Sequence, residues 1–331
     1  MQRREFITVL CGTGVTWPSV LLAQQPATTK RIAMVHPAEK VGNMTITGRR
    51  FFRAFFEELG KSGYVEGQNL LVERYSGEGR PEHLAELARE VVSTRPDLIV
   101  ALSGAVASHF KEATTIPIIA TSSDPIVAGL VPSLAHPAGN ITGVSVDAGI
   151  AIWGKRLELL REALTKLSNA RFLTLQRDML EASAVREAAN RAQISLVDTL
   201  LGSPINEAAY QRVFTSMKQD QVDGLVVSAE AEHIANRVVI AELAAKNRIP
   251  AIYPFREFTE VGGLLAYSVD LGETARLMAD IVGKVLKGAN PRDIPFSQQT
   301  KFELIVNLKA SRALGLEISP TLVARSDEVI E

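Results

Sequence analysis

Short polar side chains follow three apolar runs of this sequence. Ser103 and Gly104 come after the first run, residues 121–124 (Thr-Ser-Ser-Asp) after the second, and residues 228–230 (Ser-Ala-Glu) after the third. Short hydroxyl groups and the free N–H groups of helix N-termini suit carboxylates and other hydrogen-bonding groups. Each segment alone is equally well explained as an ordinary helix N-cap. Three such segments in one chain favour a shared binding cleft.

Motifs that would carry a reaction are missing from the sequence. A dinucleotide-binding enzyme needs Gly-x-Gly-x-x-Gly after its first strand, where this chain has His-Pro-Ala-Glu-Lys at residues 36–40. There is no Gly-x-Ser-x-Gly nucleophile elbow. The five histidines lack the spacings of zinc sites, and we interpret each as a surface or capping residue. We therefore expect a protein that is not an enzyme and has neither cofactor nor metal.

Composition and charge exclude further classes of protein. The 331 residues are 46% hydrophobic and 22% charged, which is ordinary for a soluble chain of two domains. The formal net charge of −1 gives no basic excess for binding nucleic acid. The single cysteine, Cys11, lies in a segment that we expect to be removed, so disulfides and cysteine-ligated metals are excluded.

The elements that must position the polar segments alternate between strand-like and helix-like patterns. Residues 32–35 read as a strand, residues 51–59 carry apolar residues at helical spacing, and residues 97–102 form an apolar run typical of a strand covered on both faces. The alternation continues to residue 267 and pauses once, near residue 146. It predicts an α/β fold of two consecutive doubly wound, Rossmann-like modules. Ligands bind such sheets at the carboxyl ends of the strands, which is where the polar segments lie.

The first 30 residues resemble an export signal. Arg3 and Arg4 precede an apolar stretch that ends on the small residue Ala23, the usual order in a signal peptide. The arginine pair before a bulky apolar residue also resembles the twin-arginine signal. An uncleaved membrane anchor fits less well, because two glycines and a proline interrupt a stretch shorter than the roughly 20 residues of a membrane span. We expect residues 1–30 to direct the protein to the periplasm.

Five further segments form an ordered series along the chain. They are Asp-Pro-Ile-Val-Ala-Gly-Leu-Val-Pro-Ser-Leu (124–134), His-Pro-Ala-Gly-Asn-Ile-Thr-Gly-Val-Ser (136–145), Gly-Gly-Leu-Leu-Ala-Tyr-Ser-Val-Asp (262–270), Gly-Ala-Asn-Pro-Arg-Asp-Ile-Pro (288–295), and Val-Asn-Leu-Lys with Leu-Gly-Leu (306–309 and 314–316). The series resembles, in the same order, motifs of the ABC transporter substrate-binding family that includes tryptophan- and tyrosine-binding members. The resemblance extends from about residue 31 to the C-terminus.

The resemblance implies a type I periplasmic binding protein, in which two lobes joined by three crossovers close on a ligand by hinge motion. The first lobe would contain residues 31–146 plus 268–298, including a returning helix around residues 271–286. The second lobe would contain residues 147–267 plus 299–331. The crossovers would lie near Asp147, Ser268 and Gln298.

The positions of residues after predicted strands and the resemblance together indicate which residues meet the ligand. The ten candidates are Ser103, Gly104, Ser122, Ser123, Asp124, Ser145, Ser228, Glu230, Tyr253 and Asp270. Ser103, Ser122 and Ser123 would hold a carboxylate. Asp124, Glu230 or Asp270 would meet an ammonium group. Tyr253, with Phe255, would stack on a planar ligand. Core or hinge packing explains these two aromatic residues equally well.

Two departures from the family pattern leave the ligand open. Ser103-Gly104-Ala105 stands where relatives often have Thr-Pro, and Ser-Ala-Glu-Ala-Glu-His (228–233) stands where the tryptophan-binding members usually have Asp or Asn. Aromatic or branched amino acids, other small carboxylates and nucleoside-like compounds all remain candidates.

The function expected is that of the extracytoplasmic solute-binding component of an ABC importer. Its partners would be a small-molecule ligand and an ABC permease in the inner membrane, without nucleic acid. The alternative is a ligand-sensing periplasmic protein that signals to a membrane receptor. Lactose-repressor-type regulators share this two-lobe fold, but an export signal stands where they carry a helix-turn-helix.

Overall fold

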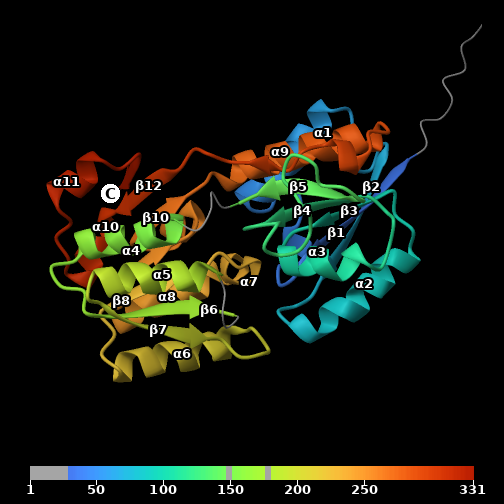
Figure 1. Cartoon of the computed structure of the whole chain (residues 1–331). Helices are drawn as coiled ribbons and strands as arrows, with labels where there is room; N and C mark the ends of the chain where they lie inside the picture. Colours follow the sequence, from blue (N-terminus) through green and yellow to red (C-terminus); the bar gives the residue numbers. More distant parts are fainter. Residues whose placement is uncertain (1–28, 147–150, 176–179) are drawn as a thin grey trace, which may run out of the picture.

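The computed structural model describes residues 29–146, 151–175 and 180–331. The described residues form two β-sheets with helices on both faces, one sheet in each lobe (Figure 1). The expected signal segment and the expected crossover at Asp147 lie outside the described residues. None of the described helices is long and apolar enough to span a membrane.

The first sheet has the strand order β11-β5-β4-β3-β1-β2, and every pair of neighbouring strands is parallel. Its strands are β1 (Lys30–His36), β2 (Leu70–Ser76), β3 (Leu98–Ala101), β4 (Ile118–Ser122), β5 (Ile141–Ser145) and β11 (Ser297–Gln298). The helices around it are α1 (Arg50–Lys61), α2 (Leu84–Ser93), α3 (Gly104–Lys111) and α9 (Leu271–Leu286). Both β3 and β4 are buried along their whole length, as expected for strands covered on both faces.

The second sheet has the order β13-β12-β10-β9-β8-β6-β7, and only the pair β10–β12 is antiparallel. Its strands are β6 (Asn169–Thr174), β7 (Ser195–Leu200), β8 (Gly224–Val227), β9 (Ala251–Tyr253), β10 (Leu265–Ser268), β12 (Glu303–Asn307) and β13 (Glu328–Ile330). Its helices are α4 (Ala151–Ala163), α5 (Leu180–Arg191), α6 (Glu207–Gln219), α7 (Ala231–Ala235), α8 (Arg237–Asn247), α10 (Leu308–Leu314) and α11 (Pro320–Ala324). Short 3-10 turns lie at Val41–Asn43, Pro81–His83, Arg256–Val261 and Pro291–Asp293.

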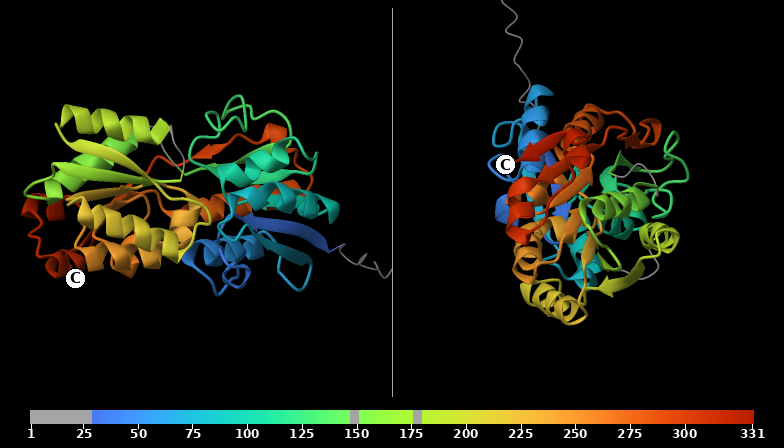
Figure 2. Two further views of the ribbon diagram at one scale, coloured as in Figure 1. Left: turned by 90° about the horizontal axis from the view of Figure 1, so that it is seen from below. Right: turned by 90° about the vertical axis from the view of Figure 1, so that its left-hand side faces the viewer.

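The chain passes from one sheet to the other three times. It completes β1 to β5 in the first sheet and β6 to β10 in the second, returns for α9 and β11, and then crosses back for β12 and β13. Figure 2 shows the two lobes side by side, and in Figure 1 α9 lies beside α1 on the first lobe. These three passes and the two parallel-dominated sheets confirm the type I α/β fold expected from the sequence.

The apolar spacing of α1 explains how the returning helix is held. Phe52, Phe55 and Leu59 lie on one stripe of α1 and are completely buried. Met278 and Val282 of α9 are equally buried and belong to the same core cluster. Two amphipathic helices distant in sequence therefore pack together over the first sheet.

One expected helix is divided into two. The apolar spacing predicts a single helix over residues 234–246, whereas α7 ends at Ala235 and α8 begins at Arg237. Asn236, between them, has φ −101° and ψ 17°, outside the helical region, and its side chain donates to the carbonyl of Glu232. Asparagine competes with helix geometry in this way by bonding nearby backbone. The break lets α7 turn separately toward the space between the lobes.

Candidate functional site

A cavity of about 650 Å³ lies between the two lobes, at the carboxyl ends of strands from both sheets. His36 at the end of β1, Leu102 after β3 and Ser122 at the end of β4 line it from the first lobe. Ala229 after β8 and Phe255 after β9 line it from the second lobe. The volume is typical of a small-molecule site. The position is the one expected for ligands of doubly wound sheets.

Ser103 and the first turn of α3 form one part of the first lobe's wall. The Oγ atom of Ser103 accepts a hydrogen bond from the backbone N–H of Val106 at 3.1 Å, so Ser103 is the N-cap of α3. The hydroxyl hydrogen of Ser103 remains available to a ligand, since capping uses only the oxygen as acceptor. The first N–H groups of α3 have no acceptor within the helix. This end of the cavity therefore offers several hydrogen-bond donors.

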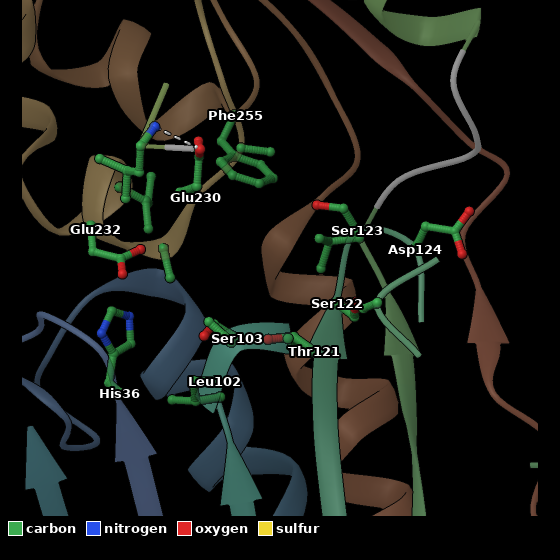
Figure 3. Close-up of a pocket in the computed structure, with 18 of the residues that line it drawn as sticks. His36, Leu102, Ser103, Thr121, Ser122, Ser123, Asp124, Glu230, Glu232 and Phe255 are labelled. Carbon is green, nitrogen blue, oxygen red and sulfur yellow. Dashed lines mark hydrogen bonds between the residues drawn. The ribbon is translucent and has the colours of Figure 1, made fainter. Parts of the chain in front are cut away.

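Three consecutive hydroxyl side chains continue the same wall. Thr121, Ser122 and Ser123 line the cavity at the end of β4 (Figure 3), and none of their hydroxyl groups has a hydrogen-bond partner in the described part of the chain. Gly104 lies beside them: a Cβ atom there would lie 3.0 Å from the Oγ of Ser122. A glycine at this position lets the start of α3 approach Ser122, and the donors of both segments converge.

Asp124 ends this wall and also shapes it. Its Oδ1 accepts hydrogen bonds from the backbone N–H groups of Ile126 (2.9 Å) and Val127 (3.0 Å). This is the local bonding that aspartate commonly makes at turns. Asp124 lines the cavity, with one carboxyl oxygen engaged by its own loop.

Glu230 supplies a carboxyl group from the opposite lobe. Its Oε1 accepts from Thr174 Oγ1 (3.0 Å) and from the backbone N–H of Leu175 (3.1 Å), and its Oε2 accepts from the hydroxyl of Ser228. Burial raises the pKa of Glu230 to about 7, although the hydrogen bonds oppose that rise. Glu230 thus lines the cavity while joining the loops that follow β6 and β8.

Glu232, two residues further on, is a site residue that the sequence interpretation missed. It lies in α7, is 6% exposed and lines the cavity. Burial raises the pKa of its carboxyl group to about 7. The repeated Glu in the segment Ser-Ala-Glu-Ala-Glu-His is the sequence signal that could have identified it.

His36 is a second missed residue: of the two roles expected for it, surface or capping, the surface role is wrong, whereas its ring does cap two backbone N–H groups. It is 3% exposed and lines the cavity at the end of β1. Its Nδ1 accepts hydrogen bonds from the backbone N–H groups of Ala38 (3.1 Å) and Glu39 (2.8 Å), so in the neutral ring Nε2 carries the hydrogen. Burial, with the nearby Arg49 guanidinium, lowers the pKa of His36 well below its usual value. His36 is therefore a neutral N–H donor at pH 7.

The interpretation as a surface or capping residue is wrong for His233, which is completely buried and bonds to another side chain. Its Nδ1 lies 2.8 Å from the Tyr210 hydroxyl, and burial lowers the pKa of His233 to about 3. This histidine supports the second lobe and does not line the cavity.

Aromatic and aliphatic side chains separate the polar walls. Phe52, Trp153 and Phe255 line the cavity and are all at least 97% buried in the folded chain. Trp153 packs edge-to-face on Phe172, with ring centroids 5.7 Å apart, which fixes the indole. The cavity thus combines flat apolar surfaces with a hydroxyl-rich wall and a carboxyl-bearing wall.

Six of the ten predicted site residues line this cavity: Ser103, Gly104, Ser122, Ser123, Asp124 and Glu230. The other four do not. Ser145 donates to the carbonyl of Ser123 (2.7 Å), and Ser228 donates to Glu230, so these two contact residues of the cavity from behind. Tyr253 stacks on Phe258 in the core, with centroids 4.7 Å apart. Asp270 caps α9 and pairs with Arg50 at 2.8 Å.

No group of three or more metal-ligating side chains occurs within residues 29–146, 151–175 and 180–331. The chemistry that the described cavity offers is hydrogen bonding, charge pairing and aromatic contact.

The chain is similar to known proteins in sequence and in fold. The family described as "ABC transporter substrate binding protein" matches residues 50–330. A tyrosine-binding protein of Clostridioides difficile (strain R20291) is 25% identical over 272 residues, which are 80% of this chain and 76% of that protein.

Two solved structures share the fold. A conserved domain protein from Vibrio cholerae has a TM-score of 0.79 and 22% identity, and the match covers 91% of this chain and all of that one. An ABC domain in complex with L-Trp from Streptococcus pneumonia has a TM-score of 0.77 and 21% identity, and the match covers 92% of this chain and all of that one.

Proposed function

The chain belongs to the ABC transporter substrate binding protein family, and we propose that it binds an amino acid in the cavity between its lobes and delivers it to an ABC permease in the inner membrane. Proteins of this family are extracytoplasmic and bind small molecules. The chain is therefore a receptor by family, and its ligand and permease are parts of the proposal.

The observation that carries the proposal is the polarity of the two cavity walls. Ser103, Ser122 and Ser123 present hydroxyl groups beside the start of α3, which suits a ligand carboxylate. The facing lobe presents carboxyl groups, which suit an ammonium group. An α-amino acid carries both groups on one carbon atom, and the aromatic residues between the walls suit a planar side chain. The relatives that bind tyrosine and tryptophan support this choice of ligand class.

We assign the residues of the proposed site two kinds of role. Ser103, Gly104, Ser122 and Ser123 form the carboxylate end. Ser145 and Ser228 do not line the cavity. They position its wall, because each donates a hydrogen bond to a residue that lines it. Their loss would misplace the wall without removing a ligand contact.

The proposed lobes are residues 31–146 with 268–298 and residues 147–267 with 299–331. The cavity lies between the two sheets, so closure of one lobe on the other would bury the ligand and exclude water. Hinge closure of this kind is a common response to a ligand bound between two domains.

Export is proposed from the sequence of residues 1–30. Cleavage after Ala23 would give a mature chain of residues 24–331 in the periplasm. Mass spectrometry of the protein from a periplasmic extract tests this directly, and a mature mass that retains residue 1 would contradict it. Replacement of both Arg3 and Arg4 by lysine should retain the protein in the cytoplasm if the twin-arginine route is used.

The ligand is tested on mature protein that has been unfolded and refolded to remove any bound solute. Amino acids, aromatic acids and nucleosides are compared by thermal shift and then by calorimetry. A ligand at one hundred times its dissociation constant adds about 2.7 kcal/mol of stability, which raises the melting temperature measurably. Stabilisation by an amino acid supports the proposal. Stabilisation only by nucleosides or by acids without an amine would overturn the choice of ligand.

A further inference from the structure

The cavity wall has an excess of carboxyl groups over cationic groups. The wall contains four carboxyl groups, those of Asp124, Glu181, Glu230 and Glu232. Its one guanidinium among the described residues, that of Arg49, already pairs with Glu39 at 2.5 Å and lies over the ring of Phe52. His36 is neutral, and His109 is an exposed residue of α3. A ligand that carries a positive charge would compensate this excess.

The four carboxyl groups differ in how fully they are bonded. Both oxygens of Glu230 accept hydrogen bonds within the second lobe. One oxygen of Asp124 accepts two hydrogen bonds within its own loop. In contrast, no other residue in the described part of the chain donates a hydrogen bond to Glu232, although its side chain is almost completely buried. Glu181 likewise accepts no hydrogen bond from another described residue, but it is only partly buried, so Glu232 is the almost completely buried carboxyl group of the wall that has no donor from another residue.

The carboxyl group of Glu232 lies at the cavity, where its oxygens can accept a hydrogen bond from a ligand. Figure 3 shows its carboxyl group extending from the second lobe toward the corner where His36 and Ser103 of the first lobe lie. His36 presents an N–H donor and Ser103 a hydroxyl group at this corner. The other titratable groups nearby are Glu230, and Tyr210 and His233, which are buried and uncharged at pH 7. No cation other than the paired Arg49 lines this corner in the described residues.

A buried carboxylate without a partner is costly, so the empty cavity favours the protonated acid. An ammonium group beside the oxygens reverses this preference, because an opposite charge stabilises the carboxylate. We propose that Glu232 is the acceptor of the ligand's ammonium group, that binding displaces a proton from it, and that Glu230 is a positioning residue for the surrounding loops. This inference rests on the proposed function and names the amine as the group selected.

The pH dependence follows from the direction of the shift. Because the pKa of Glu232 is raised to about 7 in the unliganded protein, protons compete with the ligand more strongly as the pH falls below 7. Binding should therefore weaken on acidification and release about one proton per ligand at pH 6. At pH 8, where the carboxyl group is already ionised, the release should be several-fold smaller.

Three probes that differ only in their charged groups test the assignment: L-tyrosine, tyramine without the carboxylate, and 3-(4-hydroxyphenyl)propionate without the amine. Calorimetry in two buffers of different ionisation enthalpy gives both the affinity and the number of protons released. Glu232→Gln should weaken both amine probes roughly 10- to 100-fold, leave the propionate unchanged and abolish proton release. Glu242→Gln, an exposed substitution on α8, serves as the matched control and should change nothing.

Folding of the variant is verified separately. Glu232→Gln should melt at or above the temperature of the parent at pH 8, because the amide carries no charge that burial penalises. Tyramine binding that depends on Glu232, without tyrosine binding, would support the inference while overturning the amino-acid proposal. Equal binding of tyramine by parent and variant would overturn the inference. So would tighter binding of the propionate than of tyramine, or failure of all three probes and of the other standard amino acids to bind.

Discussion

The serine hydroxyls of the first lobe differ in what they already bind, and this decides what each can do for a ligand. Ser145 uses its hydroxyl to hold the carbonyl of Ser123. Ser122 lines the cavity, and its hydroxyl has no partner within the described residues. The two side chains lie on neighbouring strands, yet only one has a donor to offer.

Ser122→Ala should weaken binding of the amino acid by about 0.5–1.5 kcal/mol, the usual net contribution of one hydrogen bond. The melting temperature of the unliganded protein should stay within a degree or two, since no protein group loses a partner. Calorimetry measures the affinity and a thermal melt measures the stability. Ser93→Ala, at the exposed end of α2, is the control. Unchanged affinity in Ser122→Ala would remove this hydroxyl from the site.

Glu257 is a buried carboxyl group that lies outside the cavity wall. It is 3% exposed, and neither carboxyl oxygen has a hydrogen-bond partner in the described part of the chain. Burial raises the pKa of Glu257 to about 7, so the folded protein prefers the protonated acid while the unfolded chain ionises near 4.5. Its contribution to stability is therefore lost as the pH rises from about 4.5 through 7.

Glu257→Gln should for this reason stabilise the protein more at pH 8 than at pH 5, with a difference on the order of 1–3 kcal/mol. Urea denaturation of parent and variant at the two pH values measures it. A stability difference that is independent of pH would show that Glu257 is ionised in the folded protein at both values.

The sequence predicts which side chains lie at the ends of the strands, but it does not predict the partners that these side chains bind. The positions of Ser103 and Ser122 follow from the rule that loops gather at the carboxyl ends of parallel strands. The burial of His36 and Glu232 does not follow from that rule, because it depends on how the second lobe faces the first. The local pattern of residue types contains no information about how the two lobes face each other.

Helix ends determine much of the site at the level of elements. The start of α3 contributes donors to the cavity, and α7 exists separately from α8 because Asn236 interrupts the helix. The sequence predicts the long periodic helices with their approximate bounds. It does not predict the break at Asn236, since apolar spacing continues across it. The two-residue strand β11 and the C-terminal strand β13 are too short to show a pattern.

Asp270 is the N-cap of α9, and its side chain also bonds to α1. Asp270 Oδ1 accepts from the backbone N–H groups of Gly272 (2.7 Å) and Glu273 (3.4 Å), while its Oδ2 pairs with Arg50. Its acidity suggested a ligand contact, and the geometry gives it a bonding partner on α1 instead. One side chain thus begins α9 and ties it to α1.

Asp270→Ala should cost about 1–2 kcal/mol of stability through loss of the cap. Asp270→Asn keeps a capping oxygen and should lose less, because it removes only the partly exposed charge pairing with Arg50 (2.8 Å) and Arg276 (4.0 Å). Chemical denaturation separates the two variants. Ligand affinity should be retained in both, and a selective loss of affinity in Asp270→Asn would instead return Asp270 to the binding site.

At the scale of the whole molecule, the connections between the lobes are bonded to each other. Gln299, at the third pass, donates to the carbonyl of Asp270 (3.2 Å) and to Thr274 Oγ1 (2.6 Å), both at the second pass. The second and third connections are therefore linked directly by hydrogen bonds. The sequence predicts that the chain crosses between lobes, from the order of its family-like segments, but not this contact.

Gln299→Ala should lower the stability by about 1–3 kcal/mol, because it removes two hydrogen bonds donated by a buried side chain, although Asp270 O and Thr274 Oγ1 remain bonded to each other. It should also loosen the coupling between the second and third passes. Small-angle scattering should show a larger radius of gyration for the unliganded variant than for the unliganded parent, and the same radius for both once a ligand is bound. Identical radii without ligand would show that Gln299 does not restrain the hinge.

The order in which the strands enter the sheets has a consequence for synthesis on the ribosome. The first lobe needs α9 and β11, yet these elements emerge only after β6 to β10 of the other lobe have been made. At cellular elongation rates the delay between residues 145 and 298 is on the order of ten seconds. During that interval the phenylalanine stripe of α1 lacks its covering helix. We expect a nascent chain of this topology to rely on a chaperone or on an export route for unfolded protein until residues 271–298 have appeared, and a route that exports only folded protein must wait for them.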